Sequence, residues 1–446
     1  MTSGPDPAPR AAALIPFGIF LIFYLGGSLW LGDFYSIPMP AAFILAGAAA
    51  LAQKSPLSFS DRVDQFARGM GESNIMLMGL IFILAGAFAA VTKAMGAVDA
   101  AVLITRHIVP PSFFLVGMFC VASVISLAIG TSCGTIAALT PIALSLPGAD
   151  SISPAIMLGA VVGGSMFGDN LSMISDTTIA ATRTQNVSMR DKFRVNIKLV
   201  LPCALLVAGI YFFAGRHAGG TETALPPVLW KHGLLVLPYI LILILALAGG
   251  NVVILLEAGT VFAAILGVCT GSFDFRTALD VAGKGILGMS ETLIVALLAG
   301  GLLTMIRLNG GLAWLMDRVA RNIHSSKGAE TGVFLLTGII NLFTANNTVA
   351  IIIAGPVARE LSCKFGCDPK RIAGILDTAS CFVQGVIPYG AQILIAAGLA
   401  RTAGLEVAAP ALAGATLYSW LMGTAVLLNI TLRRREQCPA SSPRNQ

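Results

Sequence analysis

The stretch from Met166 to Ile179 has the sequence MFGDNLSMISDTTI, in which polar side chains interrupt an apolar region. Long apolar runs flank it, which predicts that it lies at membrane depth. It nevertheless contains Asp169, Asp176, one asparagine, two serines and two threonines. A charged side chain at the centre of a bilayer costs roughly 2.5–3.5 kcal/mol, so such residues usually face a cavity or a partner. Because carboxylate, hydroxyl and carbonyl oxygens are the ligands of hard cations, the stretch predicts a desolvated cation held at Asp169 and Asp176.

The rest of the chain has the composition of a membrane protein. Of its 446 residues, 56% are hydrophobic and 11% are charged, against about 25% charged in soluble domains. Apolar runs of about 20 residues recur as far as Leu432. The net charge of +6 does not indicate nucleic acid binding, because the basic residues are scattered through short loops. We therefore expect an all-α polytopic protein of the lipid bilayer, whose first apolar run is an uncleaved span rather than a signal peptide.

The sequence also predicts an internal duplication. Pro141 and Pro356 have the same separation along the chain as Pro154 and Pro369 (356 − 141 = 215 and 369 − 154 = 215). Prolines at a constant offset argue against a chance similarity between apolar segments. The expected organisation is a tail, a first repeat, a linker, a second repeat and a second tail, at residues 1–10, 11–215, 216–231, 232–432 and 433–446.

In each repeat the fourth of six apolar segments is interrupted, at Gly130–Thr135 and at Thr344–Thr348. Such a segment crosses the membrane as a broken helix or turns back as a hairpin. The orientation of a membrane protein follows the Lys and Arg residues in its short loops, which gather on the cytoplasmic side. If the fourth segments are hairpins, 21 of the 28 Lys and Arg residues lie on one side of the membrane, whereas 16 do so if these segments cross fully. We therefore expect two inverted-topology repeats, each with five crossings, one of them discontinuous, plus one re-entrant hairpin. The expected hairpins and discontinuous helices lie at about 113–146 and 331–356, and at about 154–182 and 370–400.

Inverted repeats with interrupted segments in matching positions are typical of secondary transporters with a site at the middle of the membrane. In a broken helix the carbonyl end suits Na⁺, and the N–H end suits an anion or a carboxylate. Asp169 has its counterpart in Gln384 (384 − 169 = 215), so the first repeat supplies acids and the second supplies amides. We include Asp377 and Thr378 in the second-repeat site. Two amphipathic segments, 97–108 and 312–323, are expected to be helices on the membrane surface.

Several roles remain open at this point. Asp176 could cap the helix that follows it or bind the ion, and Asp377 could contact cytoplasmic water or belong to the site. Glu257 is a candidate proton carrier, or a packing partner between the repeats. Gly130–Gly134 also matches the GxSxG pattern of serine hydrolases, but it lacks the strand–turn–helix context and a base. We therefore do not expect an enzyme.

The stretch Gly168-Asp-Asn-Leu-Ser172, followed by Ser175-Asp-Thr-Thr178, resembles the signature of NhaC-type sodium/proton antiporters. The Gly-Thr-Ser-Cys-Gly-Thr135 interruption is similar to the hairpin motif of that family. The resemblance covers most of the chain and implies an inverted-repeat fold with two hairpins. It also implies a homodimer in which a transport domain moves against a fixed scaffold in an elevator-like step. The implied cation ligands are Thr131, Ser132, Asp169, Asn170, Ser175, Asp176 and Thr177, with Asn346, Asn347, Thr348 and Asp377 from the second repeat.

Two residues beside the expected site depart from the family pattern. Met173 stands where proline is usual, and Cys133 stands where a larger aromatic residue is common. We expect a bacterial inner-membrane antiporter that exchanges cytoplasmic Na⁺ or Li⁺ for H⁺, with both termini in the cytoplasm and no cofactor besides these ions. The alternative is a Na⁺-coupled or exchanging carrier of a small carboxylate or amino acid.

Overall fold

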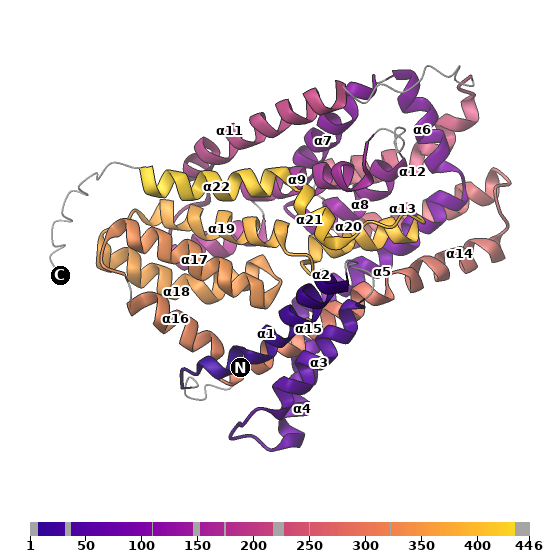
Figure 1. Ribbon diagram of the computed structural model, residues 1–446. Helices are drawn as coiled ribbons and strands as arrows, with labels where there is room; N and C mark the ends of the chain where they lie inside the picture. The colour runs from indigo at the N-terminus through magenta and orange to yellow at the C-terminus, as the bar shows by residue number, and fades with distance from the viewer. Residues whose placement is uncertain are drawn as a thin grey trace.

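The structure is a computed structural model that describes residues 8–31, 37–108, 110–145, 152–173, 175–216, 227–248, 250–321 and 323–432. In these ranges every regular element is a helix (Figure 1). The predicted tail 433–446, most of the tail 1–10 and most of the linker 216–231 lie outside the described residues. The all-α prediction is confirmed for the part of the chain that is described.

The helices follow one another along the chain with few long connections. The first half contains α1 (Ile15–Leu21), α2 (Gly27–Leu31), α3 (Met39–Ala52), α4 (Phe59–Met70), α5 (Ser73–Ala94), α6 (Ala97–Ile108), α7 (Phe114–Ile129), α8 (Ser132–Ser145), α9 (Pro154–Leu171), α10 (Asp176–Gln185) and α11 (Met189–Arg216). The second half contains α12 (Trp230–Leu247), α13 (Val252–Cys269), α14 (Phe275–Gly288), α15 (Ser290–Leu308), α16 (Gly311–Arg321), α17 (Ser326–Thr344), α18 (Asn347–Phe365), α19 (Pro369–Val386), α20 (Ala391–Thr402), α21 (Ala409–Ala415) and α22 (Leu417–Leu432).

The two interrupted segments form helix pairs with sharp turns between them. Gly130, at φ 77°, ends α7, and its N–H donates to the carbonyl of Ser126. Ala345, at φ 46°, ends α17 in the same left-handed conformation. That conformation is rare for a residue with a Cβ and natural for glycine. The Asn346 side chain then caps α18 by accepting from the N–H of Val349 at 3.0 Å.

Both helices predicted to be discontinuous are interrupted. The first consists of α9 and α10, with a gap after Leu171, and the second consists of α19 and α20, with a gap after Val386. Proline occupies the first turn of α9 and of α19, where its missing N–H costs nothing. The starts of α8 and α18, of α9 and α19, and of α10 and α20 are related by one offset (347 − 132 = 369 − 154 = 391 − 176 = 215).

The hairpin helices α7, α8, α17 and α18 pack against the discontinuous helices α9, α10, α19 and α20 in a crossed arrangement. Helix α7 lies along α9, and α17 lies along α19, within the same half of the chain. The short helix α10 instead packs against α18, and α20 packs against α8, so each half contacts the hairpin of the other. The close approach of α7 and α9 depends on Gly164 and Gly168, where an added Cβ would lie 2.3 Å from a carbonyl oxygen of α7. The turns of the two hairpins and the gaps in the two discontinuous helices therefore lie next to one another, around one cavity.

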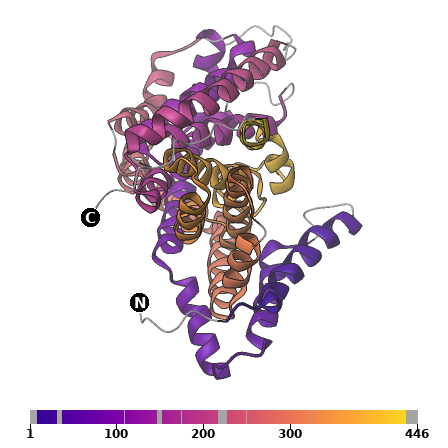
Figure 2. The ribbon, with the colours of Figure 1, turned by 90° about the vertical axis from the view of Figure 1, so that its left-hand side faces the viewer.

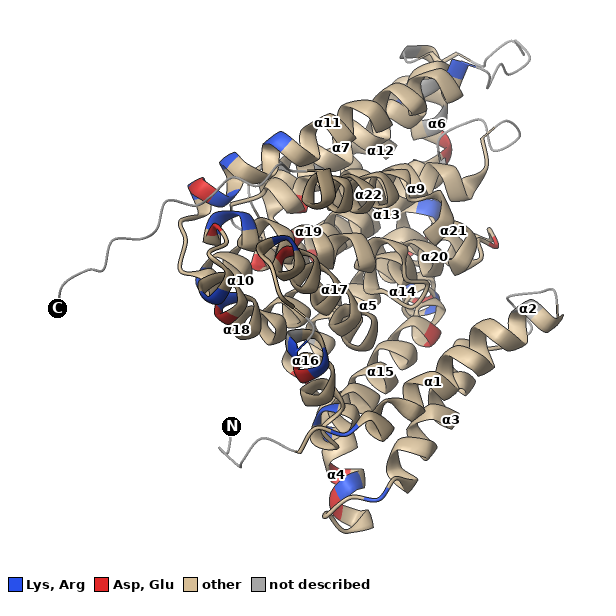
Figure 3. Cartoon of the chain, turned by 60° about the vertical axis from the view of Figure 1, so that its left-hand side comes forward, with Lys and Arg blue, Asp and Glu red and all other residues tan. Residues whose placement is uncertain are grey.

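The remaining helices form a second group. Helices α1, α3 and α4 pack with α15 and project from the main body, as Figures 1 and 2 show. Helix α5 packs against both α13 and α14, and α12 lies between α6 and α13. Figure 3 shows charged residues gathered at α4 and near the ends of α10, α16 and α18, with long uncharged stretches along α1, α3 and α7.

Within the described residues, five helices are long and apolar enough to cross a membrane, or six if the bent pair α21 and α22 is one span. They are Ile75–Ala94, Met189–Arg216, Val252–Cys269, Phe275–Leu308 and Pro369–Thr402. The chain is therefore a multi-pass membrane protein, and the expected ten crossings stay a prediction. The helices expected at 97–108 and 312–323 are present as α6 and α16. Two amphipathic helices, α4 and α14, lie in connections for which no helix was predicted.

Candidate functional site

The interruptions of the four segments line a small cavity. Its volume is about 90 Å³, and part of its wall comes from α5. The lining residues are Leu77, Met78, Ile81, Gly130, Thr131, Ser132, Cys133, Asp169, Ser175, Asp176, Thr177, Ala345, Asn346, Asn347, Thr348, Gln384, Ala391 and Gln392. Hydroxyl, amide and carboxylate groups thus converge from both halves of the chain on one space, whose remaining wall is apolar.

Asp169 is the buried carboxylate of this cavity, with 3% of its surface exposed. It lies in the last turn of α9, where the helix dipole is unfavourable to a negative charge. Two hydroxyls compensate: Ser132 Oγ donates to Oδ2 at 3.0 Å, and Ser175 Oγ donates to Oδ1 at 2.5 Å. Thr177 Oγ1 lies 2.9 Å from Ser175 Oγ and extends the cluster. The carboxylate is therefore held in place by the hairpin and by the break in its own helix.

Amide side chains continue this cluster into the second half of the chain. Gln392 Nε2 donates to Ser132 Oγ at 3.0 Å, and Gln384 Nε2 donates to Gln392 Oε1 at 2.9 Å. The Gln384 amide also donates to the carbonyl of Ala345, at the second hairpin turn, at 2.8 Å. One continuous set of hydrogen bonds therefore joins the two hairpin turns through Gln392 and Gln384, and Asp169 is bonded to it at Ser132.

The structure brings most of the predicted site residues together. Those that line the cavity are Thr131, Ser132, Asp169, Ser175, Asp176, Thr177, Asn346, Asn347, Thr348 and Gln384. Asp176 differs from Asp169 because its side chain is exposed. It occupies the first position of α10, and the residue before it, Ser175, is the N-cap. The side chain of Ser175 bonds to Asp169 and makes no cap bond.

Four predicted residues lie outside this cavity. Asn170 points the other way, and its amide nitrogen lies 3.2 Å from Tyr418 Oη. Thr378 donates to the carbonyl of Gly374 within its own helix. Glu257 lies on an exposed part of α13, so the structure does not bring this candidate proton carrier to Asp169. The fourth is Asp377.

Asp377 is fully buried, so it does not contact cytoplasmic water. It forms an ion pair with Lys192, with 2.5 Å between Nζ and Oδ2. Lys192 was predicted to lie in a loop, as one of the Lys and Arg residues counted for orientation. A usable signal existed, because Lys192, Asn196, Val200 and Val207 are spaced by about one or two helical turns and all face the core.

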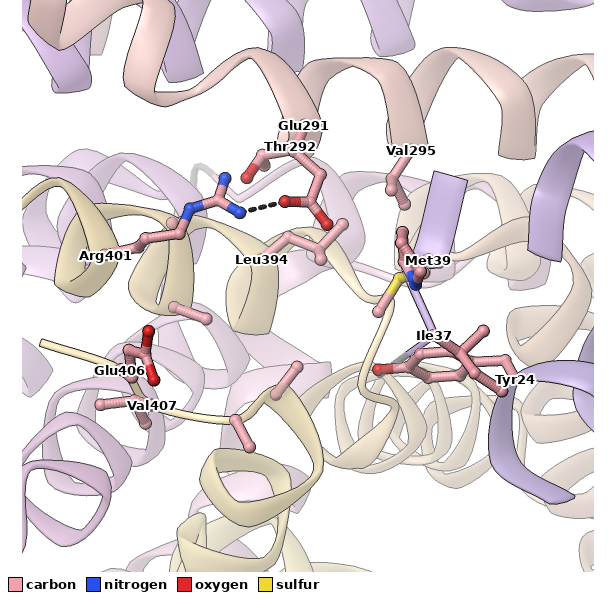
Figure 4. A pocket seen from close by; sticks show the side chains of 15 residues that line it. Tyr24, Ile37, Met39, Glu291, Thr292, Val295, Leu394, Arg401, Glu406 and Val407 are labelled. Atoms are coloured by element: carbon pink, nitrogen blue, oxygen red, sulfur yellow. Dashed lines mark hydrogen bonds and ion pairs between the residues drawn. The ribbon is translucent and has the colours of Figure 1, made fainter. Parts of the chain in front are cut away.

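A larger cavity, of about 290 Å³, lies beside α15 and α20 (Figure 4). Arg401 on α20 is paired with Glu291 on α15, and Glu406 lines the same space. About half of the Arg401 side chain is exposed, and no predicted site residue lines this cavity. This cavity lies between α20 and α15, and its charged residues are partly exposed, unlike Asp169.

Interrupted apolar helices around a buried carboxylate are the features of a secondary transporter. The family model described as "Na+/H+ antiporter family" matches residues 17–216 and 228–409. The chain belongs to this family, and its resemblance to NhaC-type antiporters is confirmed.

Three curated proteins with different printed activities are similar to this chain. The Na(+)/H(+) antiporter NhaC of Bacillus subtilis (strain 168) is 23% identical, over 79% of this chain and 84% of that protein. The malate-2H(+)/Na(+)-lactate antiporter of the same organism is 21% identical, over 86% and 88%. The arginine/ornithine antiporter ArcD of Halobacterium salinarum is 23% identical, over 86% and 85%. All three are named antiporters, which supports a transporter rather than an enzyme.

Proposed function

We propose that the protein is a Na⁺/H⁺ antiporter in which Asp169 binds Na⁺ and H⁺ in alternation. The observation that carries this proposal is the environment of Asp169. It is a buried carboxylate on the wall of a polar cavity, and two serine hydroxyls hold it in place. A cation at the carboxylate would take oxygen ligands from Ser132, Ser175 and Thr177, and a proton on the carboxylate would replace it when it leaves.

The size of the cavity favours an ion over a bulky solute. Pockets for organic ligands usually have volumes of about 300–1,000 Å³, whereas this cavity has about 90 Å³. No cofactor enters the proposed exchange, because only the two ions have to reach Asp169.

We further propose that the two halves are inverted repeats, with ten crossings and two re-entrant hairpins in total. The protein would lie in the inner membrane of a bacterium, with both termini in the cytoplasm. The constant offset between matching helix boundaries supports the repeat, as does the crossed packing of α10 on α18 and α20 on α8. A homodimer with an elevator-like movement completes the proposal. In that movement, the hairpins and broken helices would shift against the group that contains α3, α4 and α15.

The test uses purified protein in proteoliposomes, with Na⁺ gradients and a pH-sensitive dye. We expect Na⁺-driven proton flux from the wild type and none from Asp169→Asn. The matched control is Asp274→Asn, an exposed N-cap whose carboxylate accepts from the N–H of Thr277, because asparagine caps a helix equally well. Flux in Asp169→Asn at the control rate, from a protein with the same melting temperature, would overturn the proposal.

The second candidate is an exchanger of a small carboxylate or amino acid. The names of two relatives, for malate with lactate and for arginine with ornithine, favour it. So do Asn346 and Asn347, which place amides and the N-terminus of α18 at the cavity wall. Uptake of labelled lactate, malate and arginine is measured in the same vesicles. The second candidate would be favoured if one of these solutes is taken up in a way that depends on Na⁺ and on Asp169. In that case Na⁺ should drive no proton flux when the solute is left out.

A further inference from the structure

Lys192 holds a second set of oxygen atoms behind the break between α9 and α10. Its Nζ lies 2.8 Å from the carbonyl oxygen of Asn170, 2.7 Å from Thr178 Oγ1 and 2.5 Å from Asp377 Oδ2. Only 1% of the side chain is exposed. Because an ammonium has three N–H donors, each donor has one acceptor here.

The chemistry of these acceptors is that of a cation site. They are one carbonyl, one hydroxyl and one carboxylate oxygen, the types that Na⁺ and other hard cations take as ligands. The carbonyl of Asn170 lies at the C-terminal end of α9, where the last carbonyls have no partner within the helix. Thr178 and Asp377 belong to α10 and α19, so three separate helices supply the oxygens. Asn196, one turn after Lys192 on α11, adds a donor at 3.3 Å from the same Asp377 oxygen.

We propose that Lys192 is a built-in cation that fills a second cation site, so that Asp377 carries no transported ion and each protomer takes up one mobile cation, at Asp169. The ammonium cannot leave, because its side chain is anchored in α11. Removing one partner of a buried ion pair leaves an uncompensated charge, so a cation that enters in place of Lys192 would be bound strongly. The inference rests on the proposed function for the mobile cation at Asp169 and for the choice of Na⁺ as the ion.

The test uses a background in which the mobile site is disabled, Asp169→Asn. In that background Lys192→Ala empties the second site, whereas Lys192→Met removes the charge and keeps most of the volume filled. Melting temperatures in detergent are compared between NaCl and choline chloride at equal ionic strength. We expect NaCl to raise the melting temperature of the Lys192→Ala variant by about 2–4 °C or more, and to leave the Lys192→Met variant and the parent unchanged.

Two outcomes would overturn the inference. The first is a Lys192→Ala variant without Na⁺-dependent stabilisation, and the second is a parent Asp169→Asn protein that Na⁺ stabilises equally well. If Lys192→Ala does not yield folded protein, equilibrium binding of radioactive Na⁺ to the wild type decides. One ion per protomer supports the inference, and two ions, with one lost in Asp377→Asn, overturn it. Failure of the proposed function is distinct, since it appears as undiminished flux in Asp169→Asn.

Discussion

Replacing Ser132 by alanine tests the hydroxyl that joins Asp169 to the amides of the second half of the chain. The Ser132 hydroxyl donates to Asp169 and accepts from Gln392, both at 3.0 Å, and it is 3% exposed. The substitution removes one oxygen ligand of the proposed cation and leaves the amide of Gln392 without that acceptor. It adds no bulk, because alanine is smaller than serine.

The expected size of the effect follows from the charge of the partner. A hydrogen bond to a charged group contributes roughly 1.5–3 kcal/mol, and about 1.4 kcal/mol corresponds to a tenfold change in affinity. We therefore expect the Na⁺ concentration for half-maximal proton flux to rise by about 10- to 150-fold. The maximal rate at saturating Na⁺ should fall much less, because Asp169 is retained.

The assay is the Na⁺ dependence of proton flux in proteoliposomes. The matched control is Ser126→Ala, on the same hairpin, whose equally buried hydroxyl donates to the carbonyl of Ser165 at 2.6 Å and does not line the cavity. This control should lower stability by about 1 kcal/mol and leave the half-saturating concentration unchanged. The reasoning is wrong if Ser132→Ala and Ser126→Ala give the same Na⁺ dependence.

Three further predictions concern other parts of the structure. Gly164→Val should lower the melting temperature, because its Cβ would meet a backbone carbonyl at 2.3 Å, whereas Gly209→Val, on open helix surface, should change stability by less than about 0.5 kcal/mol in the same thermal-shift assay. Glu257→Gln should leave proton flux in proteoliposomes unchanged, because this residue is exposed and outside the cavity; lost flux would make it a proton carrier. Arg401→Gln should cost about 0–1 kcal/mol by chemical denaturation, because its pair with Glu291 is half-exposed, and a larger loss would show that the pair holds α20 to α15.

The sequence predicted the fold best where polar residues interrupt apolar runs. The offset between Pro154 and Pro369 equals the offset between the starts of α9 and α19, because proline is favoured in the first turn of a helix. The offset from Asp169 to Gln384 likewise identified two side chains that meet in one cavity. Both signals are local: proline acts within its own helix turn, and a polar residue in an apolar run is costly whichever helix its partner comes from.

The sequence failed where the answer depended on which helix faces meet. Lys192 lies in the first turn of α11, so charge counting assigned it to a loop, although it faces the core. Asp377 could not be placed without it, because this lysine, on a helix in the other half of the chain, is its partner. Asp176 was expected to share the burial of Asp169, but the gap after Leu171 turns it outward at the start of α10. The spacing of Lys192, Asn196 and Val200 indicates a buried face of α11, but it does not show which helix packs against that face.

The unequal burial of Asp169 and Asp176 has a consequence for how an ion could reach the protein interior. Asp176 is exposed at the cavity, whereas Asp169 is enclosed by hydroxyl groups. An arriving cation would first exchange only part of its hydration shell for the outer carboxylate. It would lose its remaining water molecules afterwards, on passing to the inner carboxylate on the far side of the helix break. Dehydration divided into two smaller steps has a lower barrier than complete dehydration in one, and discrimination between Na⁺ and K⁺ would then take place at the second step.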